Sequence, residues 1–154
     1  MADSLEARIA EQVVGALEGG NPVLVATVMA APDGQGEHVG AKLLVRTDGS
    51  TFGSLGVAAL DSVITAGAGG AFRRHRVHTL YLSSAGKEQS RREAAGEAFQ
   101  VMVEVHEQSC ALVIAGGGHV GKALSEIASL CGFRVTVIDD RPEYADPERF
   151  PEAE

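Results

Sequence analysis

The stretch VIAGGGHVGKAL, residues 113–124, constrains the fold more than any other part of this 154-residue chain. An apolar run enters a glycine-rich turn and leaves it with helical spacing. Gly116, Gly118 and Gly121 fill the pattern G-x-G-x-x-G. In that pattern the first glycine permits a sharp turn, the second lets a pyrophosphate approach the backbone, and the third lets the helix press on the strand. Because a helix N-terminus also offers N–H groups to an anion, we expect these glycines to contact phosphate.

The residues on both sides of this turn have the pattern of a β-α-β unit. Residues 111–115 form a continuous apolar run, typical of a parallel strand buried on both faces. After the turn, apolar residues recur at helical spacing until Gly132 stops the helix. These apolar helix positions are Val120, Leu124, Ile127, Ala128 and Cys131. A second apolar strand is expected at residues 133–138.

The second strand leads directly into two aspartates and an arginine. Asp139 lies 18 positions after Gly121, near the separation of about 20 at which an acid binds ribose hydroxyls in dinucleotide sites. Asp139 is a better ribose candidate than Asp140 because it directly follows the strand. Arg141 would favour a 2′-phosphate unless the adjacent acids hold it, so the choice between NAD and NADP stays open. The context favours a nucleotide-binding unit, and the alternative is an α/β turn that binds no nucleotide.

The histidines give no clear sign of catalysis or metal binding. His119 lies inside the turn, where its side chain would either reach a bound phosphate or remain exposed. His75 and His78 do not share a face of an extended segment, so we interpret them as solvated surface rather than as metal ligands. The sequence shows no Ser-His-Asp set and no acid pair in a catalytic context. We therefore predict binding rather than turnover, with no catalytic residues and no metal site.

Charge and composition argue against several classes of protein. Thirteen basic and 21 acidic residues give a net charge of −8, which disfavours nucleic acid and anionic membranes as partners. The chain has no apolar run of about 18 residues and no signal-peptide core at its start, so a cytoplasmic location is expected. In that reducing compartment, Cys110 and Cys131 are expected to be buried free thiols, with a metal or redox pair as the alternative.

Residues 1–108 have the pattern of a separate α+β domain. The first helix is expected after Asp3 or Ser4, with four apolar residues on one face: Leu5, Ile9, Val13 and Leu17. Strands are expected at residues 23–30, 41–46, 51–55, 79–83 and 99–106, with an Asp-Gly hairpin turn at residues 47–50. A short helix from Val57 is expected to break at the glycines of residues 67–70, and residues 85–99 are expected to form a surface helix or mobile loop. The whole fold is then α/β, with a partial Rossmann-like β-α-β unit at residues 109–154.

Three stretches of the chain together resemble the XdhC and CoxI family, accessory proteins in the maturation of molybdenum hydroxylases such as xanthine dehydrogenase. These stretches are GGGHVGKAL, GFRVTVIDDRPEYADPERFPEA and, upstream, GAKLLVRTDGSTFGSLG. The resemblance implies a Rossmann-like domain in the C-terminal part. It also implies a molybdenum-cofactor chaperone that receives the pterin cofactor (molybdopterin), protects it and passes it to an apo molybdenum hydroxylase.

The chain departs from the pattern of that family in its N-terminal domain. Family members have a segment of the type G-[ST]-[IV]-x-G-G-x-x-E, whereas this chain reads GSLGVAALD, with Val57 and Ala58 at the glycine pair and Asp61 at the glutamate. The cysteine positions of the family hold other residues, and the first loop offers Glu37 and His38 in place of an arginine. We interpret the chain as a short, degenerate member that holds any cofactor without a thiolate.

Two other functions and one structural question stay open at this point. The glycine motif alone also fits an NAD(P)-dependent oxidoreductase, and the loss of family motifs fits a protein-interaction module that no longer binds cofactor. One strand, one helix and a second strand cannot complete the usual six-stranded Rossmann sheet. Because apolar strands need cover and neighbours, a homodimer or a complementary subunit is expected.

Overall fold

The structure, a computed structural model, describes residues 4–74, 77–94 and 96–154 of the chain. It divides into two compact units, residues 1–108 and residues 109–154. In the described part, no helix is both long and apolar enough to span a membrane. Asp3 and His75, which the sequence singled out, lie outside the described residues.

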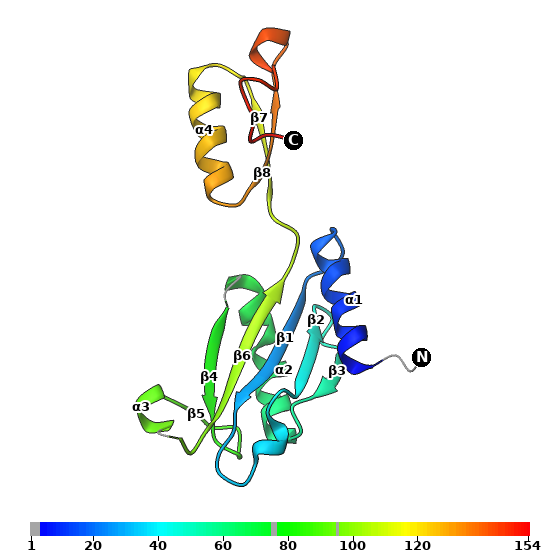
Figure 1. Ribbon diagram of the computed structural model, residues 1–154, viewed down its shortest axis with the longest axis vertical. Helices are drawn as coiled ribbons and strands as arrows, with labels where there is room; N and C mark the ends of the chain where they lie inside the picture. The colour runs from blue at the N-terminus through cyan, green and yellow to red at the C-terminus, as the bar shows by residue number, and fades with distance from the viewer. Residues whose placement is uncertain (1–3, 75–76, 95) are drawn as a thin grey trace. The chain divides into compact units, whose positions relative to one another are not determined.

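The N-terminal unit is built on a six-stranded antiparallel sheet with the strand order β3-β2-β1-β6-β4-β5 (Figure 1). Its strands are β1 (Val23–Ala30), β2 (Lys42–Arg46), β3 (Thr51–Ser54), β4 (His78–Leu82), β5 (Glu88–Gln89) and β6 (Phe99–His106). The β2–β3 hairpin turns at Gly49, which has a φ of 83°, and Asp48 Oδ1 accepts a hydrogen bond from the Ser50 N–H at 2.8 Å. The remaining elements are the helices α1 (Leu5–Leu17), α2 (Ala58–Arg74) and α3 (Arg91–Ala94), and a 3₁₀ turn at Gly36–His38.

Helix α1 covers one face of this sheet. It begins after Ser4, whose hydroxyl accepts a hydrogen bond from the Ala7 N–H at 3.2 Å. Ile9 and Ala16 are buried against residues of β1 and β2. Leu17, predicted to share that face, is 51% exposed. Ala16 fills the contact instead, because it lies seven residues, about two helical turns, after the buried Ile9.

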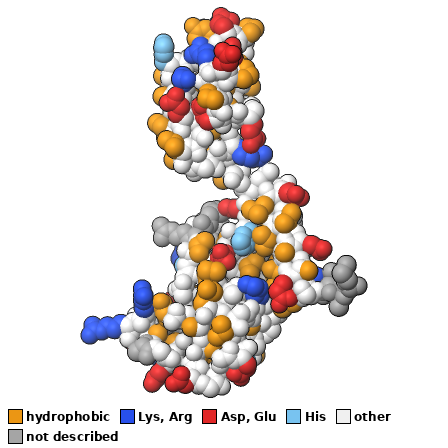
Figure 2. Space-filling model, in the orientation of Figure 1, with side chains coloured by type: hydrophobic (Ala, Val, Ile, Leu, Met, Phe, Trp, Pro, Cys, Tyr) orange, Lys and Arg blue, Asp and Glu red, His pale blue; other side chains and the backbone are white. Residues whose placement is uncertain are grey.

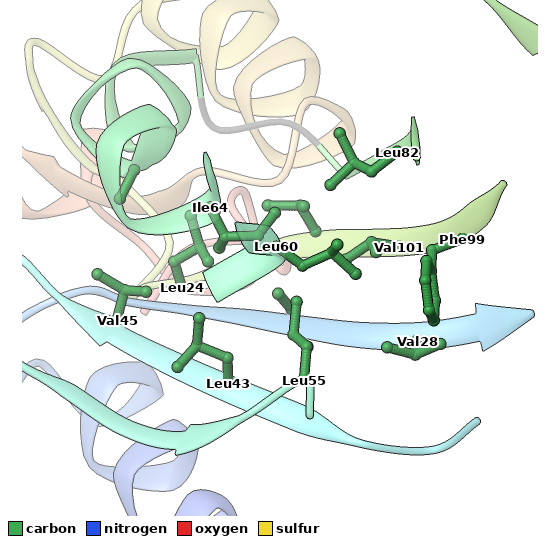
Figure 3. Packing of buried hydrophobic residues seen from close by; sticks show 13 residues of the cluster. Leu24, Val28, Leu43, Val45, Leu55, Leu60, Ile64, Leu82, Phe99 and Val101 are labelled. Carbon is green, nitrogen blue, oxygen red and sulfur yellow. The ribbon is translucent and has the colours of Figure 1, made fainter. Parts of the chain in front are cut away.

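Helix α2 covers the opposite face, where the larger core lies (Figure 3). Leu60 and Ile64 of α2 pack onto apolar side chains of the sheet, among them Leu24, Val101 and Phe99. The prediction that this helix breaks at residues 67–70 is wrong, because α2 continues to Arg74. A buried alanine in that segment, Ala68, packs into the core, and this contact offsets the poor helix propensity of the glycines around it.

The C-terminal unit consists of β7 (Ala111–Ala115), α4 (His119–Leu130) and β8 (Arg134–Ile138), followed by a 3₁₀ turn at Pro142–Tyr144. The two strands are parallel, in a register that pairs Ala111 with Arg134 and Ala115 with Ile138. This is a β-α-β unit, and the α/β fold class predicted from the sequence is confirmed.

Two details of this unit differ from the sequence prediction. Helix α4 packs through its small residues, Gly121, Ser125 and Ala128, which are buried, whereas the larger apolar residues predicted for that face point outward. The large exposed apolar side chains of α4 are Val120, Leu124, Ile127 and Leu130, and apolar surface lies along the α4 edge of the unit in Figure 2. The strands were predicted to be buried on both faces, yet Val113 and Ile138 are 61% and 53% exposed. A single helix covers only one face of a two-stranded sheet.

Candidate functional site

The glycine-rich turn joins the carboxyl end of β7 to α4, and each glycine of the motif has a distinct environment. Gly116 has a φ of 111°, a conformation that other residues rarely adopt, and its N–H donates to the Ile138 carbonyl at 2.8 Å. A Cβ on Gly121 would collide with the Gly116 carbonyl, so the helix lies directly against the turn. A Cβ on Gly118 would meet nothing within 4 Å. The backbone at Gly118 is therefore open to an approaching group.

Helix α4 begins at this turn without a side-chain cap. Gly118 occupies the N-cap position, makes no side-chain hydrogen bond, and is followed by a first turn without acidic residues. By contrast, α1 has the Ser4 hydroxyl at its cap and Glu6 in its first turn. The first N–H groups of a helix have no partners within the helix and carry a partial positive charge. The start of α4 therefore suits an anion supplied from outside the chain.

Asp139, the residue directly after β8, ties the turn to the segment that follows. Its Oδ2 accepts hydrogen bonds from the Gly117 N–H at 2.8 Å and from Arg141 Nη2 at 3.1 Å. Its Oδ1 accepts from the Arg141 backbone N–H and from Arg141 Nε, each at 3.0 Å. The guanidinium and backbone donors of Arg141, with the Gly117 N–H, hold the pKa of Asp139 well below its usual range. Asp139 in turn raises the pKa of Arg141.

The segment after Arg141 packs against the turn, a feature that the glycine motif did not reveal. A Cβ on Gly117 would collide with the Tyr144 carbonyl, so only a glycine fits there. The Arg149 Nη2 donates to the Gly117 carbonyl at 3.1 Å, and Lys122 Nζ donates to the Arg149 carbonyl at 2.7 Å. Two guanidinium groups lie over the Tyr144 ring, that of Arg141 at 3.8 Å and that of Arg149 at 4.8 Å from its centre. Tyr144 and Arg149 thus clamp the backbone of Gly117. The aromatic and basic residues of DDRPEYADPERF were the sequence feature that could have indicated this clamp.

Most of the candidate residues gather around one open hollow of about 420 Å³ at the carboxyl ends of β7 and β8. It is lined by Ala115, Gly116, Ile138, Asp139, Asp140 and Arg141. The carboxylate of Asp140 is 97% exposed, and Arg141 is 53% exposed. His119 is the first residue of α4 and is exposed, outside the lining of the hollow. In parallel α/β sheets, ligands bind outside the carboxyl ends of the strands, which is where this hollow lies.

In the N-terminal unit, the segment that departs from the family pattern forms a tight loop before α2. The Asp61 carboxylate accepts hydrogen bonds from the Ser54 hydroxyl at 2.7 Å and from the Leu55 N–H at 2.8 Å. Gly56 has a φ of 84° and lies against the His38 ring, with which a Cβ would collide. Asp61 therefore stabilises the loop through these two contacts.

Neither cysteine lies at the glycine turn. Cys110 precedes β7 and Cys131 follows α4, whereas the turn lies between the other ends of these elements. Both thiols are free and exposed, so the prediction that they are buried is wrong. Among the described residues, no group of three or more His, Cys, Asp or Glu residues is arranged to hold a metal ion.

Comparison with known proteins connects both units to one family. Residues 112–154 match the XdhC Rossmann domain, and residues 16–81 match the XdhC and CoxI family. The uncharacterized protein YqeB of Escherichia coli (strain K12) is 30% identical over 113 residues, a match that covers 72% of this chain and 21% of YqeB. The chain thus spans about a fifth of the length of this curated relative. A crystal structure described as a xanthine dehydrogenase from Bacillus halodurans matches 100% of this chain and 67% of its own, with 16% identity and a TM-score of 0.39.

Proposed function

Because the chain belongs to the XdhC and CoxI family, we propose that it acts in the maturation of molybdenum hydroxylases of the xanthine dehydrogenase type. In this role it binds the molybdenum cofactor and hands it to the apo-hydroxylase. The observation that carries the proposal is the backbone at Gly118, which is open at the start of an uncapped helix. A phosphate group, whether of the pterin cofactor or of a nucleotide such as NAD(P), is the ligand that such a turn suits.

The donors around the turn fit the phosphate end of the pterin cofactor. The N–H groups at the start of α4 would bind the phosphate oxygens, beside the hollow at the carboxyl ends of β7 and β8. Lys122, in the first turns of α4, is held by the Arg149 carbonyl and by Glu126, whose carboxylate lies 3.7 Å away. Lys122 therefore stabilises the segment after Arg141, and the backbone N–H groups at the start of α4 are left as the phosphate ligands.

The same residues do not offer a thiolate to the metal end of the cofactor, because both cysteines lie at the far end of the β-α-β unit. When bound, the cofactor supplies the molybdenum centre that the hydroxylase uses. The role of this chain is then to hold the phosphate end and release the whole group. A carrier must release its cofactor, so a site built on backbone N–H groups beside an open hollow suits this role better than a covalent or thiolate contact.

Apolar surface on the C-terminal unit supports a protein partner. Val113 and Ile138 are exposed on the open face of the sheet, and α4 exposes Val120, Ile127 and Leu130. An exposed apolar surface of this kind is typical of an interaction site. We assign to this surface the apo-hydroxylase, a second copy of the chain or a complementary subunit.

The test of this function is a transfer experiment. The chain is purified from cells that make the pterin cofactor and is then mixed with an apo molybdenum hydroxylase, whose activity is followed. We expect the loaded chain to restore hydroxylase activity and to lose its own pterin in proportion. A loaded chain that keeps its pterin and activates no hydroxylase would contradict the handover.

A further inference from the structure

The carboxylate that sequence patterns assign to ribose recognition is already saturated by the protein. An ionised carboxylate has about four acceptor positions, two on each oxygen. In Asp139 each oxygen accepts two hydrogen bonds, at distances from 2.8 to 3.1 Å, and all four donors belong to Gly117 and Arg141. The side chain of Asp139 is only 2% exposed. The carboxylate therefore has no acceptor position left for a ribose hydroxyl.

A ribose hydroxyl would have to displace a strong pair to reach this carboxylate. The Arg141 guanidinium contacts Asp139 through Nε and Nη2, and such charge-assisted, two-point contacts are stronger than hydrogen bonds from a neutral hydroxyl. The guanidinium is also held over the Tyr144 ring, at 3.8 Å from its centre. Both contacts favour the closed arrangement over an exchange with ribose.

The charge of the pair has a second consequence for ligand choice. In nucleotide sites of this type, a free carboxylate accepts hydrogen bonds from the ribose 2′-hydroxyl and disfavours a 2′-phosphate. Here the positive charge of Arg141 lies against Asp139, so neither effect is expected from this residue. Asp140 is 97% exposed, and its own contribution can be separated by mutation.

We propose that Asp139 is a positioning residue for the glycine turn, and that the site binds ligands through phosphate without reading the ribose 2′ position. This proposal rests on the function proposed above, in that the turn is taken to bind a phosphorylated ligand. Arg141 is the residue that sets this lack of discrimination. Replacing it frees one acceptor position on each oxygen of Asp139, because the bonds from the Gly117 N–H and from the backbone N–H of residue 141 remain.

The experiment is calorimetric titration with three probes: NAD, NADP and the 2′-deoxyadenosine form of NAD. The wild-type chain should bind all three with similar affinity. The Arg141→Gln variant should prefer NAD over the deoxy probe by about tenfold, the ratio expected for one gained hydrogen bond to a charged acceptor. Arg134→Gln is the matched control, since it removes the same charge from the opposite end of β8. Circular dichroism of each variant checks that the fold is retained.

Three results would overturn the proposal. The first is a wild-type chain that already prefers NAD over NADP and the deoxy probe by about tenfold. This result overturns the proposal whichever of the two variants, Asp139→Asn or Asp140→Asn, then removes the preference. The second is an Arg141→Gln variant that binds but discriminates no better than the wild type. The third is absence of binding by both proteins, because a freed carboxylate then creates no ribose site. Molybdopterin content of the same wild-type preparation tests the proposed function separately.

Discussion

Gly118 differs from its neighbours in the turn because nothing in the protein requires it to be a glycine. Its φ of −68° and ψ of −168° are open to any residue, and its side-chain position faces empty space. Gly116 needs its positive φ, while Gly117 and Gly121 are pressed against carbonyl groups. We therefore propose that the close approach of a ligand, rather than the fold, accounts for the glycine at 118.

Gly118→Val should therefore remove ligand binding and leave the C-terminal unit folded. The branched side chain would occupy the space that a phosphate needs, and its Cβ would have no protein atom within 4 Å. Titration calorimetry with NAD, NADP and ATP measures the loss, with Ala123→Val on the exposed side of α4 as the control. Equal affinity in Gly118→Val and the wild type would show that the ligand binds elsewhere.

The hydrogen bonds of the Asp139 carboxylate to Gly117 and Arg141 predict a loss of stability in acid. Because the folded-state pKa of Asp139 is lowered, its contribution is complete above the pKa of an unfolded aspartate, about 3.9, and is lost as the pH falls below that value. The fall in melting temperature between pH 6 and pH 3 should be smaller in Asp139→Asn than in the wild type. Asp140→Asn removes an exposed carboxylate next to it and serves as control. An identical fall in melting temperature in all three proteins would contradict a stabilising role of the Asp139 carboxylate.

At the scale of the elements, α2 shows where local sequence rules fail. Three glycines in residues 67–70 suggested a break, because glycine is a poor helix former. The helix continues because Ala68, Ile64 and Leu60 gain buried contacts with the sheet, a long-range effect that periodicity alone does not reveal. The strands at residues 23–30, 99–106 and 111–115, by contrast, were predicted with their observed bounds, since apolar runs between turn residues depend less on tertiary context.

The difference between local geometry and long-range packing also explains which parts of the candidate site could be predicted from the sequence. The spacing of Gly116, Gly118 and Gly121 was enough to place a strand-to-helix turn there, because each position has a local geometric reason. The sequence raised the pairing of Arg141 with the adjacent acids as an alternative, but the contacts of the segment after Arg141 with Gly117 were not predictable in the same way. They depend on the path of the chain after β8, and the fold that brings Tyr144 and Arg149 onto Gly117 has no simple periodic signature.

Gly67→Ala should stabilise the N-terminal unit if α2 is continuous through its glycines. Gly67 lies in the helix with open space at its side-chain position, so alanine should add about 0.5–1 kcal/mol to the free energy of unfolding. Urea denaturation measures the change. Gly86→Ala is the opposing control, because Gly86 has a φ of 76° and a Cβ there would lie 2.9 Å from the Ala59 carbonyl oxygen. A loss of stability in Gly67→Ala would place a helix break where the structure has none.

At the scale of the whole molecule, the exposed apolar surface of the C-terminal unit predicts self-association. Val120, Ile127 and Leu130 are 82%, 59% and 89% exposed, and two-fold pairs are the commonest assembly of soluble proteins. Light scattering across a dilution series should show a particle of twice the 16.0 kDa chain mass. Ile127→Lys should shift it toward monomer, while Val39→Lys, at an exposed position of the other unit, should not. A monomer at every concentration would contradict the dimer.

We propose that this chain carries the molybdenum cofactor by its phosphate, at the turn before α4 and without a thiolate. The most direct test is the amount of molybdopterin retained per chain after purification from cells that make the cofactor. The wild type and the Cys110→Ser/Cys131→Ser double variant should retain similar amounts, whereas Gly118→Val should retain almost none. Retention by Gly118→Val at the wild-type level, or a marked loss in the folded double cysteine variant, would contradict this account.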